Sequence, residues 1–251
     1  MRSRAELYDW ELAHVAGRLR QDLAFYSGLA PRGGGSVLEL ACGTGRLTVP
    51  LDAVGLDIDG AMLGVARRRG ARTLVRADMR RFALARHFDL VVIAYNSLQL
   101  LVDDDDLVAC LRCAASHLGP DGVIALEVTD FQAGASGASV APERLAGAEG
   151  VTLHGGLVHD LTRRITTYHR RVREGNDVRV DHVALRCLDR VELETLLRWA
   201  GLGVVEMAGA QPGVFCVARR QGGDGDHDPA YGSAVSRRTM ALATRVPARL
   251  D

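Results

Sequence analysis

The sequence predicts an α/β fold in which a parallel β-sheet is covered by helices on both faces. Between residues 36 and 131, short apolar runs alternate with helical stretches. Five runs are apolar on both faces, as expected for strands buried in a parallel sheet: SVLEL, AVGLDI, TLVRA, FDLVVIAY and GVIALEV. A glycine-rich turn follows the first run, at the end of the strand where such sheets bind their ligands.

The remaining segments of this region are predicted to be helical. Residues 4–30 carry apolar side chains at helical spacing. Pro50 and the short connection over residues 41–52 limit the first helix between strands. Further helices are expected to begin near Gly45, Ala61 and Asp104, with a short turn near Arg80.

The pattern changes after residue 131. Residues 132–148 are small and irregular, which indicates a flexible connection. Period-two alternation on either side of Gly175-Asn176-Asp177 then predicts a β-hairpin. Asp189 and Glu192 form the capping box of a further helix, and two strands follow it. We expect a core over 1–131, an antiparallel cap over 132–188, a closing helix with the last two strands of the core over 189–220, and a disordered tail over 221–251.

Composition excludes several classes of function. The chain has 31 basic and 31 acidic residues, so it lacks the positive field that collects nucleic acid or an anionic membrane surface. Every basic residue is arginine, which excludes a lysine Schiff base and a P-loop lysine. The N-terminus has no apolar core of a secretory signal, and the longest apolar stretch is too short to span a bilayer.

The cysteines indicate a reducing compartment and no metal site. Their number, five, is odd and their spacing shows no paired loops, which suits the cytoplasm. Cys110 and Cys113 form a CxxC inside a helical run, but no second pair completes a zinc set. We expect both to be packed core thiols.

The glycine turn ACGTGRLT favours a nucleoside over a dinucleotide. Gly43 and Gly45 are present, but Thr48 stands where a dinucleotide fingerprint requires a third glycine. Asp57 ends the second strand, where a carboxylate can accept hydrogen bonds from both hydroxyls of a ribose. Asp59 competes for this role, but we favour it as the N-cap of the helix that begins at Ala61.

A second carboxylate, Asp78, follows the third strand. It could accept a hydrogen bond from an adenine amino group while the Met79 N–H donates to the neighbouring ring nitrogen. It could equally cap a helix, and the spacing leaves both interpretations open.

Four segments together resemble a known family. In order, VLELACGTGRLTVPL, GLDIDGAML, RADMRRF and FDLVVIAYNSLQLL resemble the first four motifs of class I S-adenosylmethionine-dependent methyltransferases. The resemblance covers about residues 6–131 and resumes over 151–219, similar to the branch of the family that acts on small molecules. It implies a Rossmann-like sheet with an inserted antiparallel β cap. It also implies methyl transfer from S-adenosyl-L-methionine to an oxygen or nitrogen of a small molecule, in natural-product metabolism. We expect a cytoplasmic monomer or homodimer.

The resemblance also implies roles for individual residues. Glu39, Gly43 and Gly45 would shape the pocket for the methionine end of the cofactor, and Arg46 would meet its carboxylate. Tyr8 would close over the cofactor, and Ala94 with Tyr95 would line the floor near the sulfonium. The first helix is shorter than is usual in the family. The complete implied cofactor set is Tyr8, Glu39, Ala41, Gly43, Gly45, Arg46, Asp57, Ile58, Met62, Asp78, Met79, Ala94 and Tyr95.

Methyl transfer is an in-line displacement in which the cofactor brings the activated carbon and the protein holds the nucleophile. A general base is needed only for a protonated amine or a hydroxyl. The candidates are His14, Glu127 and His169, with Tyr168 and His182 as further cap residues. Two alternatives stay open: an enzyme of this fold that binds S-adenosylmethionine for a non-methylating reaction such as a cyclisation, and a non-catalytic binding or regulatory protein.

Overall fold

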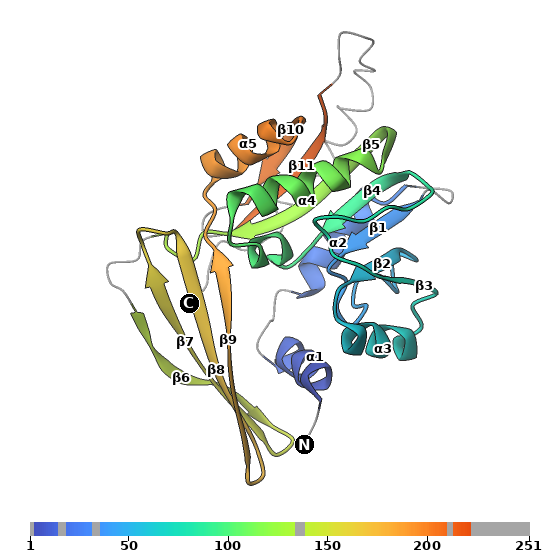
Figure 1. The fold of residues 1–251 in the computed structure, drawn as a ribbon. Helices are drawn as coiled ribbons and strands as arrows, with labels where there is room; N and C mark the ends of the chain where they lie inside the picture. Colours follow the sequence, from blue (N-terminus) through green and yellow to red (C-terminus); the bar gives the residue numbers. More distant parts are fainter. Residues whose placement is uncertain (1–2, 15–18, 32–35, 134–138, 210–212, 222–251) are drawn as a thin grey trace.

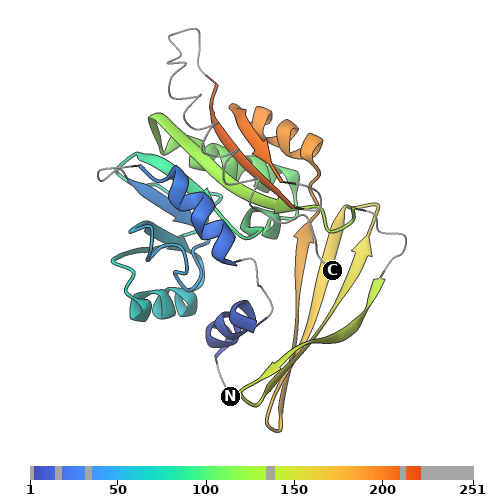
Figure 2. The same cartoon turned by 180° about the vertical axis from the view of Figure 1, so that it is seen from behind.

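The computed structural model describes residues 3–14, 19–31, 36–133, 139–209 and 213–221. A seven-stranded sheet carries helices on both faces, and a four-stranded antiparallel sheet extends beside it (Figures 1 and 2). This arrangement confirms the predicted fold class.

The central sheet has the strand order β10-β11-β5-β4-β1-β2-β3. Its five parallel strands are β1 (Val37–Leu40), β2 (Val54–Asp57), β3 (Thr73–Arg76), β4 (Phe88–Ile93) and β5 (Leu118–Thr129). Two further strands, β10 (Leu202–Ala208) and β11 (Gly213–Arg220), complete it, and β11 runs antiparallel to both of its neighbours. The order reverses between β1 and β4, which creates a crevice at the carboxyl ends of the strands.

The two faces of the sheet are covered by different helices. On one face lies α2 (Leu19–Leu29), and on the other lie α4 (Asp104–Ser116) and α5 (Arg190–Trp199) (Figures 1 and 2). Successive residues of β4 point to opposite faces, so Val92 packs in the cluster with Phe25 of α2, whereas Val91 packs with Leu111 of α4. Burial on both sides explains why the parallel strands read as continuous apolar runs.

The N-terminal segment predicted as one helix over 4–30 is divided into two helices. α1 (Arg4–His14) lies between the core and the cap, away from α2 (Figure 1). Residues 15–18, between them, lie outside the described residues. Leu7 and Trp10 of α1 pack against Val151 and Leu153 of the cap, so the first helix belongs to the cap interface and not to the sheet.

The prediction of a helix from about Gly45 is wrong. The connection between β1 and β2 consists of hydrogen-bonded turns and contains no regular helix. Two single helical turns form, with Val49 N–H donating to Gly45 O at 3.2 Å and Leu51 N–H donating to Leu47 O at 3.0 Å. Pro50 lies between these two donors and has no N–H of its own, so the ladder of a regular helix is interrupted.

The cap is an antiparallel sheet of order β6-β7-β8-β9. Its strands are β6 (Ser139–Ala148), β7 (Val151–Asp160), β8 (Ile165–Glu174) and β9 (Asp177–Arg186). The predicted hairpin at Gly175 is confirmed, since β8 pairs with β9 from Glu174 and Asp177 onward. The expectation of a flexible connection over 132–148 is wrong for its second half, because residues 139–148 form the edge strand β6. Two irregularities of register, the first of them spanning Pro142, hide the period-two pattern there.

Two short helices and the N-terminal capping of α5 complete the fold. α3 (Gly60–Arg69) lies beside β2 and β3, and the 3-10 helix η1 (Ser97–Leu100) follows β4. The predicted capping box of α5 is confirmed, with Asp189 accepting from Glu192 N–H and Glu192 accepting from Asp189 N–H. The tail predicted to be disordered lies outside the described residues from 222 onward. Within the part of the chain that the structure describes, no helix has the length and apolarity needed to cross a membrane.

Gly45 is expected to be the glycine that tolerates substitution least in the first crossover. Its φ is +78°, and an added Cβ would lie 2.9 Å from the Ala66 Cβ of α3. Gly70 offers a control, because its φ of +105° is also positive and disfavours a side chain, while nothing lies within 4 Å of an added Cβ. We expect Gly70→Ala to lower the free energy of unfolding by about 1–2 kcal/mol and Gly45→Ala by roughly 1–3 kcal/mol more. Urea unfolding of both variants measures the difference; equal losses would contradict the predicted clash.

Candidate functional site

A cavity of about 830 Å³ opens at the carboxyl ends of β1, β2, β3 and β4, between α1 and the cap. Its size suits a nucleoside cofactor together with part of a second molecule. Of the residues implied for cofactor binding, those that line it are Tyr8, Ala41, Gly43, Asp57, Ile58, Met62, Asp78, Met79 and Tyr95.

Asp57 joins the ends of two neighbouring strands. Gly43 N–H donates to its Oδ2 at 2.7 Å, and Asp59 N–H donates to its Oδ1 at 2.8 Å. Burial raises the pKa of Asp57, while these backbone donors oppose the rise. Each carboxylate oxygen keeps a further lone pair, so the pair of oxygens can still accept two hydroxyl groups from the cavity. A vicinal diol such as that of a ribose fits this donor set.

The prediction for Asp59 is confirmed. Its Oδ1 accepts from Ala61 N–H at 2.8 Å, which makes it the N-cap of α3. The second carboxylate, Asp78, lines the cavity but is held by Arg80, whose Nη2 donates to Oδ2 at 2.7 Å and whose backbone N–H donates to Oδ1 at 2.9 Å. Arg80 holds the pKa of Asp78 below its usual value and also pairs with Asp106 of α4 at 2.7 Å. Asp78 therefore stabilises a local turn by accepting hydrogen bonds from Arg80, and its contact with adenine stays a prediction.

Tyrosine rings line the cavity on the side of α1. Burial, followed by the charges of Glu11 and Glu127, raises the pKa of Tyr95 to about 12. Burial also raises the pKa of Tyr8. Both hydroxyl groups therefore stay protonated near neutral pH. Tyr95 and Asn96 have φ values of 51° and 59°, so two consecutive non-glycine residues adopt the left-handed conformation directly after β4.

Glu39 lies behind the cavity wall and does not line it. Its carboxyl group is buried and accepts a short hydrogen bond from the Thr48 hydroxyl. Burial raises the pKa of Glu39 to about 8, although Thr48 and the charge of Arg46 lower it. Glu39 is therefore mostly protonated at neutral pH and acts on the site through the turn that follows β1.

Three other implied cofactor residues also lie behind the lining. Arg46 forms a bidentate pair with Asp22 of α2, at 2.9 and 2.6 Å, which attaches the glycine turn to that helix. Gly45 faces Ala66 of α3, and Ala94 is buried at the end of β4. A direct contact of Arg46 with the cofactor carboxylate stays a prediction.

The three catalytic candidates do not line the cavity. The His14 ring is exposed, stacks on Trp10 at 4.6 Å between centroids, and donates from Nδ1 to the Trp10 carbonyl at 2.7 Å. Glu127 lies on the α2 face of β5, paired with Phe215 of β11. His169 is exposed beside His182, on the face of the cap opposite to Tyr168. The geometry therefore does not support these three as bases acting within the cavity.

A polar group lines the cavity opposite the strand ends, and of its three residues the sequence named only Tyr168, as a candidate base. Glu11 of α1 and Tyr168 and Arg170 of β8 meet there. The sequence contains two signals for this group. Glu11 is three residues after Tyr8 and therefore lies on the same face of the helix. The alternation of β8 in period two places Tyr168 and Arg170 on one face of the strand. Besides Asp59, whose N-cap role was predicted, the other lining residues have no predicted role and are Arg4, Leu12, Leu56, Ala77, Arg80, Asn96, Ser97, Leu100, Leu101, Val102, Asp106, Phe131, Leu157, Val183 and Leu185.

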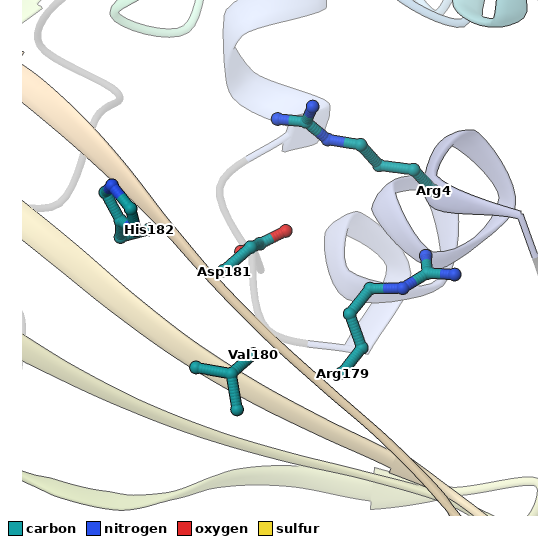
Figure 3. A pocket seen from close by; sticks show the side chains of 5 residues that line it. All are labelled: Arg4, Arg179, Val180, Asp181 and His182. Carbon is teal, nitrogen blue, oxygen red and sulfur yellow. The ribbon is translucent and has the colours of Figure 1, made fainter.

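A second depression, of about 440 Å³, lies at the outer edge of the cap beside α1. Figure 3 shows its five side chains, with Arg4 of α1 next to Arg179 of β9. It contains none of the residues predicted for cofactor binding. Arg4 lines both this depression and the main cavity, so the two are neighbours.

Comparison with known proteins agrees with this geometry. A family model described as "Methyltransferase domain" matches residues 37–122, which hold β1 to β4 and the glycine turn. The chain is 38% identical over 98 residues to the dTDP-3-amino-3,6-dideoxy-alpha-D-glucopyranose N,N-dimethyltransferase of Streptomyces fradiae, covering 37% of this chain and 38% of the relative. It is 33% identical over 156 residues to the dTDP-3-amino-3,4,6-trideoxy-alpha-D-glucopyranose N,N-dimethyltransferase of Streptomyces venezuelae, covering 58% of this chain and 59% of the relative. The matched segments thus span about two fifths to three fifths of these curated relatives.

The similarity in structure extends further along the chain. The crystal structure of DesVI from Streptomyces venezuelae superposes with a TM-score of 0.71 and 27% sequence identity. That superposition covers 88% of this chain and 100% of the other. The cap and the closing strands are therefore shared features, in addition to the matched domain.

Proposed function

Because the chain belongs to the class I S-adenosylmethionine-dependent methyltransferases, we propose that it transfers a methyl group from S-adenosylmethionine to the amino group of a nucleotide-linked amino sugar in natural-product biosynthesis. The observation that carries the proposal is the Asp57 carboxylate, which reaches the cavity while Gly43 N–H holds it at 2.7 Å. The names of the relatives from Streptomyces support an amino group as the acceptor.

The residues of this chain fit the cofactor. Asp57 would accept the two ribose hydroxyls, and Asp78 with the Met79 N–H would read the adenine edge. Met62 and Leu101 provide apolar cavity surface. The bound cofactor supplies a methyl group made electrophilic by a positively charged sulfur.

The chemical step balances without a protein nucleophile. The lone pair of the acceptor nitrogen forms the new N–C bond while the C–S bond breaks with its electron pair going to sulfur. The nitrogen then releases one proton to the solvent. The role of the protein is to hold the nitrogen in line with the breaking bond and to exclude water.

The nucleotide part of a nucleotide-linked acceptor would extend out of the cavity past α1 and β9. Arg4 and Arg179 lie together at that edge, and guanidinium groups suit the oxygens of a diphosphate. The five cysteines are all free thiols, which fits the cytoplasm. A monomer or a homodimer stays the expectation for the assembly.

Two measurements test the proposed function. Native mass spectrometry of the purified protein is expected to show retained S-adenosylmethionine or S-adenosylhomocysteine. Incubation with S-adenosylmethionine and dTDP-3-amino-3,6-dideoxy-α-D-glucopyranose should add 14 or 28 mass units to the sugar, as expected for one or two methyl groups in place of hydrogen. Retained cofactor without any methylated product favours the non-methylating alternative, and no cofactor favours the non-catalytic one.

A further inference from the structure

We infer that Glu11 is the residue that selects an amino group over a hydroxyl group in the acceptor. This inference rests on the proposed function, because it assigns the acceptor side of the same cavity. Glu11 lies on α1 three residues after Tyr8, so one helix face presents both side chains to the cavity. One of the two would close over the cofactor and the other would receive the acceptor.

The contacts of Glu11 fix its carboxylate and leave acceptor capacity. Arg170 Nη1 donates to Glu11 Oε2 at 2.8 Å, and the Tyr168 hydroxyl donates to Oε1 at 3.3 Å. A carboxylate has about four lone-pair positions, and these two bonds occupy two of them. At least one oxygen position therefore stays available for a donor from the cavity.

Glu11 shares its positively charged partner with a second carboxylate. Arg170 gives Nε and Nη2 to a bidentate pair with Asp181 at 2.7 and 2.8 Å, and only Nη1 reaches Glu11. Two carboxylates therefore share one guanidinium, and the group of three carries a net charge of −1. The Arg170 and Glu11 side chains are 13% and 16% exposed, whereas Asp181 is 29% exposed and shares the outer depression with Arg4 and Arg179. Solvent and neighbouring cations therefore act mainly on Asp181, and the charge of Glu11 is the less screened of the two.

An ammonium or amino group is the acceptor chemistry that completes this cluster. A protonated amine offsets the charge of Glu11 and donates hydrogen bonds to its free positions, and it loses one proton to the solvent before its lone pair can attack the methyl carbon. A hydroxyl group donates one hydrogen bond and leaves the charge uncompensated. The neighbouring hydroxyls of Tyr168 and Tyr95 remain neutral, because burial and the Glu11 carboxylate raise the pKa of both tyrosines.

The test is a binding measurement on protein loaded with S-adenosylhomocysteine, in which no transfer occurs. Isothermal titration calorimetry compares two amino probes, dTDP-3-amino-3,6-dideoxyglucose and dTDP-3-amino-3,4,6-trideoxyglucose, with the hydroxyl analogue dTDP-6-deoxyglucose. The variant Glu11→Gln removes the charge and keeps the shape. The matched control is Glu6→Gln, since Glu6 is exposed on the same helix and glutamine preserves its capping contact with Ser3.

We expect Glu11→Gln to weaken binding of the amino probes by about 10- to 100-fold, the range of a hydrogen bond to a charged group. The hydroxyl probe and S-adenosylhomocysteine should bind within about twofold of wild type. The pair of Arg170 and Asp181 remains in the variant, so the fold should persist. Glu11→Asp keeps the charge and is expected to keep the preference for the amino probes. This second variant tests the inference if Glu11→Gln folds poorly.

Three results overturn the inference. One is equal weakening of amino and hydroxyl probes by Glu11→Gln, which indicates a structural role. Another is loss of the amino preference in Glu6→Gln as well. The third is wild-type protein that retains S-adenosylhomocysteine but binds neither amino probe, which leaves the cofactor half of the proposed function standing. Wild-type protein that does not retain S-adenosylhomocysteine would overturn both the proposed function and this inference.

Discussion

Asp57→Ala is expected to abolish retention of S-adenosylmethionine. The proposed ribose contact consists of two hydrogen bonds to a charged acceptor, each worth about 1.5–3 kcal/mol, so the dissociation constant should rise at least about 100-fold. The substitution also removes the acceptor of Gly43 N–H, which would free the glycine turn from the end of β2. Native mass spectrometry and calorimetry with S-adenosylhomocysteine measure the loss.

The control for this experiment is Asp59→Ser. Asp59 also lines the cavity, but its carboxylate caps α3 by accepting from Ala61 N–H, and serine is an equally good N-cap residue. We expect the variant to bind S-adenosylhomocysteine within about threefold of wild type. Binding lost in Asp59→Ser and kept in Asp57→Ala would reverse the assignment of the ribose ligand.

Far-UV circular dichroism and thermal unfolding separate binding from folding in Asp57→Ala. The buried Asp57 accepts two backbone N–H groups, so some loss of stability is expected with the loss of affinity. A folded variant that retains no cofactor supports the site. A folded variant that retains it at wild-type affinity contradicts the central step of the proposed function.

The cofactor side of the site could be predicted because its signals are local in sequence. A glycine turn after a buried strand and an acid at the end of the next strand are brought together by the topology of any parallel sheet. Gly43 and Asp57 are 14 positions apart, and the hydrogen bond between them follows from the adjacency of β1 and β2. The structure adds what spacing cannot give, namely that Glu39 and Arg46 lie behind the wall.

The acceptor side could not be predicted because it depends on packing between distant segments. Glu11 and Arg170 are 159 positions apart, and their contact requires the cap to fold against α1. Histidines were chosen as candidates because imidazole is a common general base. The register of β8, however, places His169 on the outer face and Arg170 on the inner one. A shift of one residue along a strand reverses this choice, and sequence periodicity alone does not say which face is buried.

The edge strand β6 could not be predicted for a related reason. β6 contains Pro142 and two irregularities of register, so neither its composition nor its alternation is typical of a strand. Its existence depends on pairing with β7, which is a tertiary contact. The missing first helix is the opposite case, where Pro50 and the short connection overrode a local helical tendency.

Glu39→Gln is expected to change the pH dependence of stability strongly between pH 4.5 and pH 8. Burial raises the pKa of Glu39 to about 8 in the folded protein, against its ordinary value of 4.5. Below pH 4.5 the carboxyl group is protonated in both states. As the pH rises from 4.5 to 8, the unfolded chain releases the proton while the folded protein keeps it, so the stability contributed by Glu39 is lost by about 1.4 kcal/mol per pH unit. Above pH 8 both states are ionised and the loss levels off, at up to about 5 kcal/mol.

Glutamine has the shape of protonated Glu39 and can accept the hydrogen bond from the Thr48 hydroxyl. The variant lacks the titration, so the free energy of unfolding of wild type minus that of the variant should fall between pH 4.5 and 8 and be flat on either side. Urea unfolding at pH 5, 6, 7, 8 and 9 measures this difference, and the eight histidines, common to both proteins, cancel in it. Because Glu39 is mostly neutral at pH 7, the variant should also retain S-adenosylhomocysteine. A difference that does not vary with pH would show that Glu39 ionises normally, and the wall behind the glycine turn would then have to hold a buried charge stabilised by Arg46.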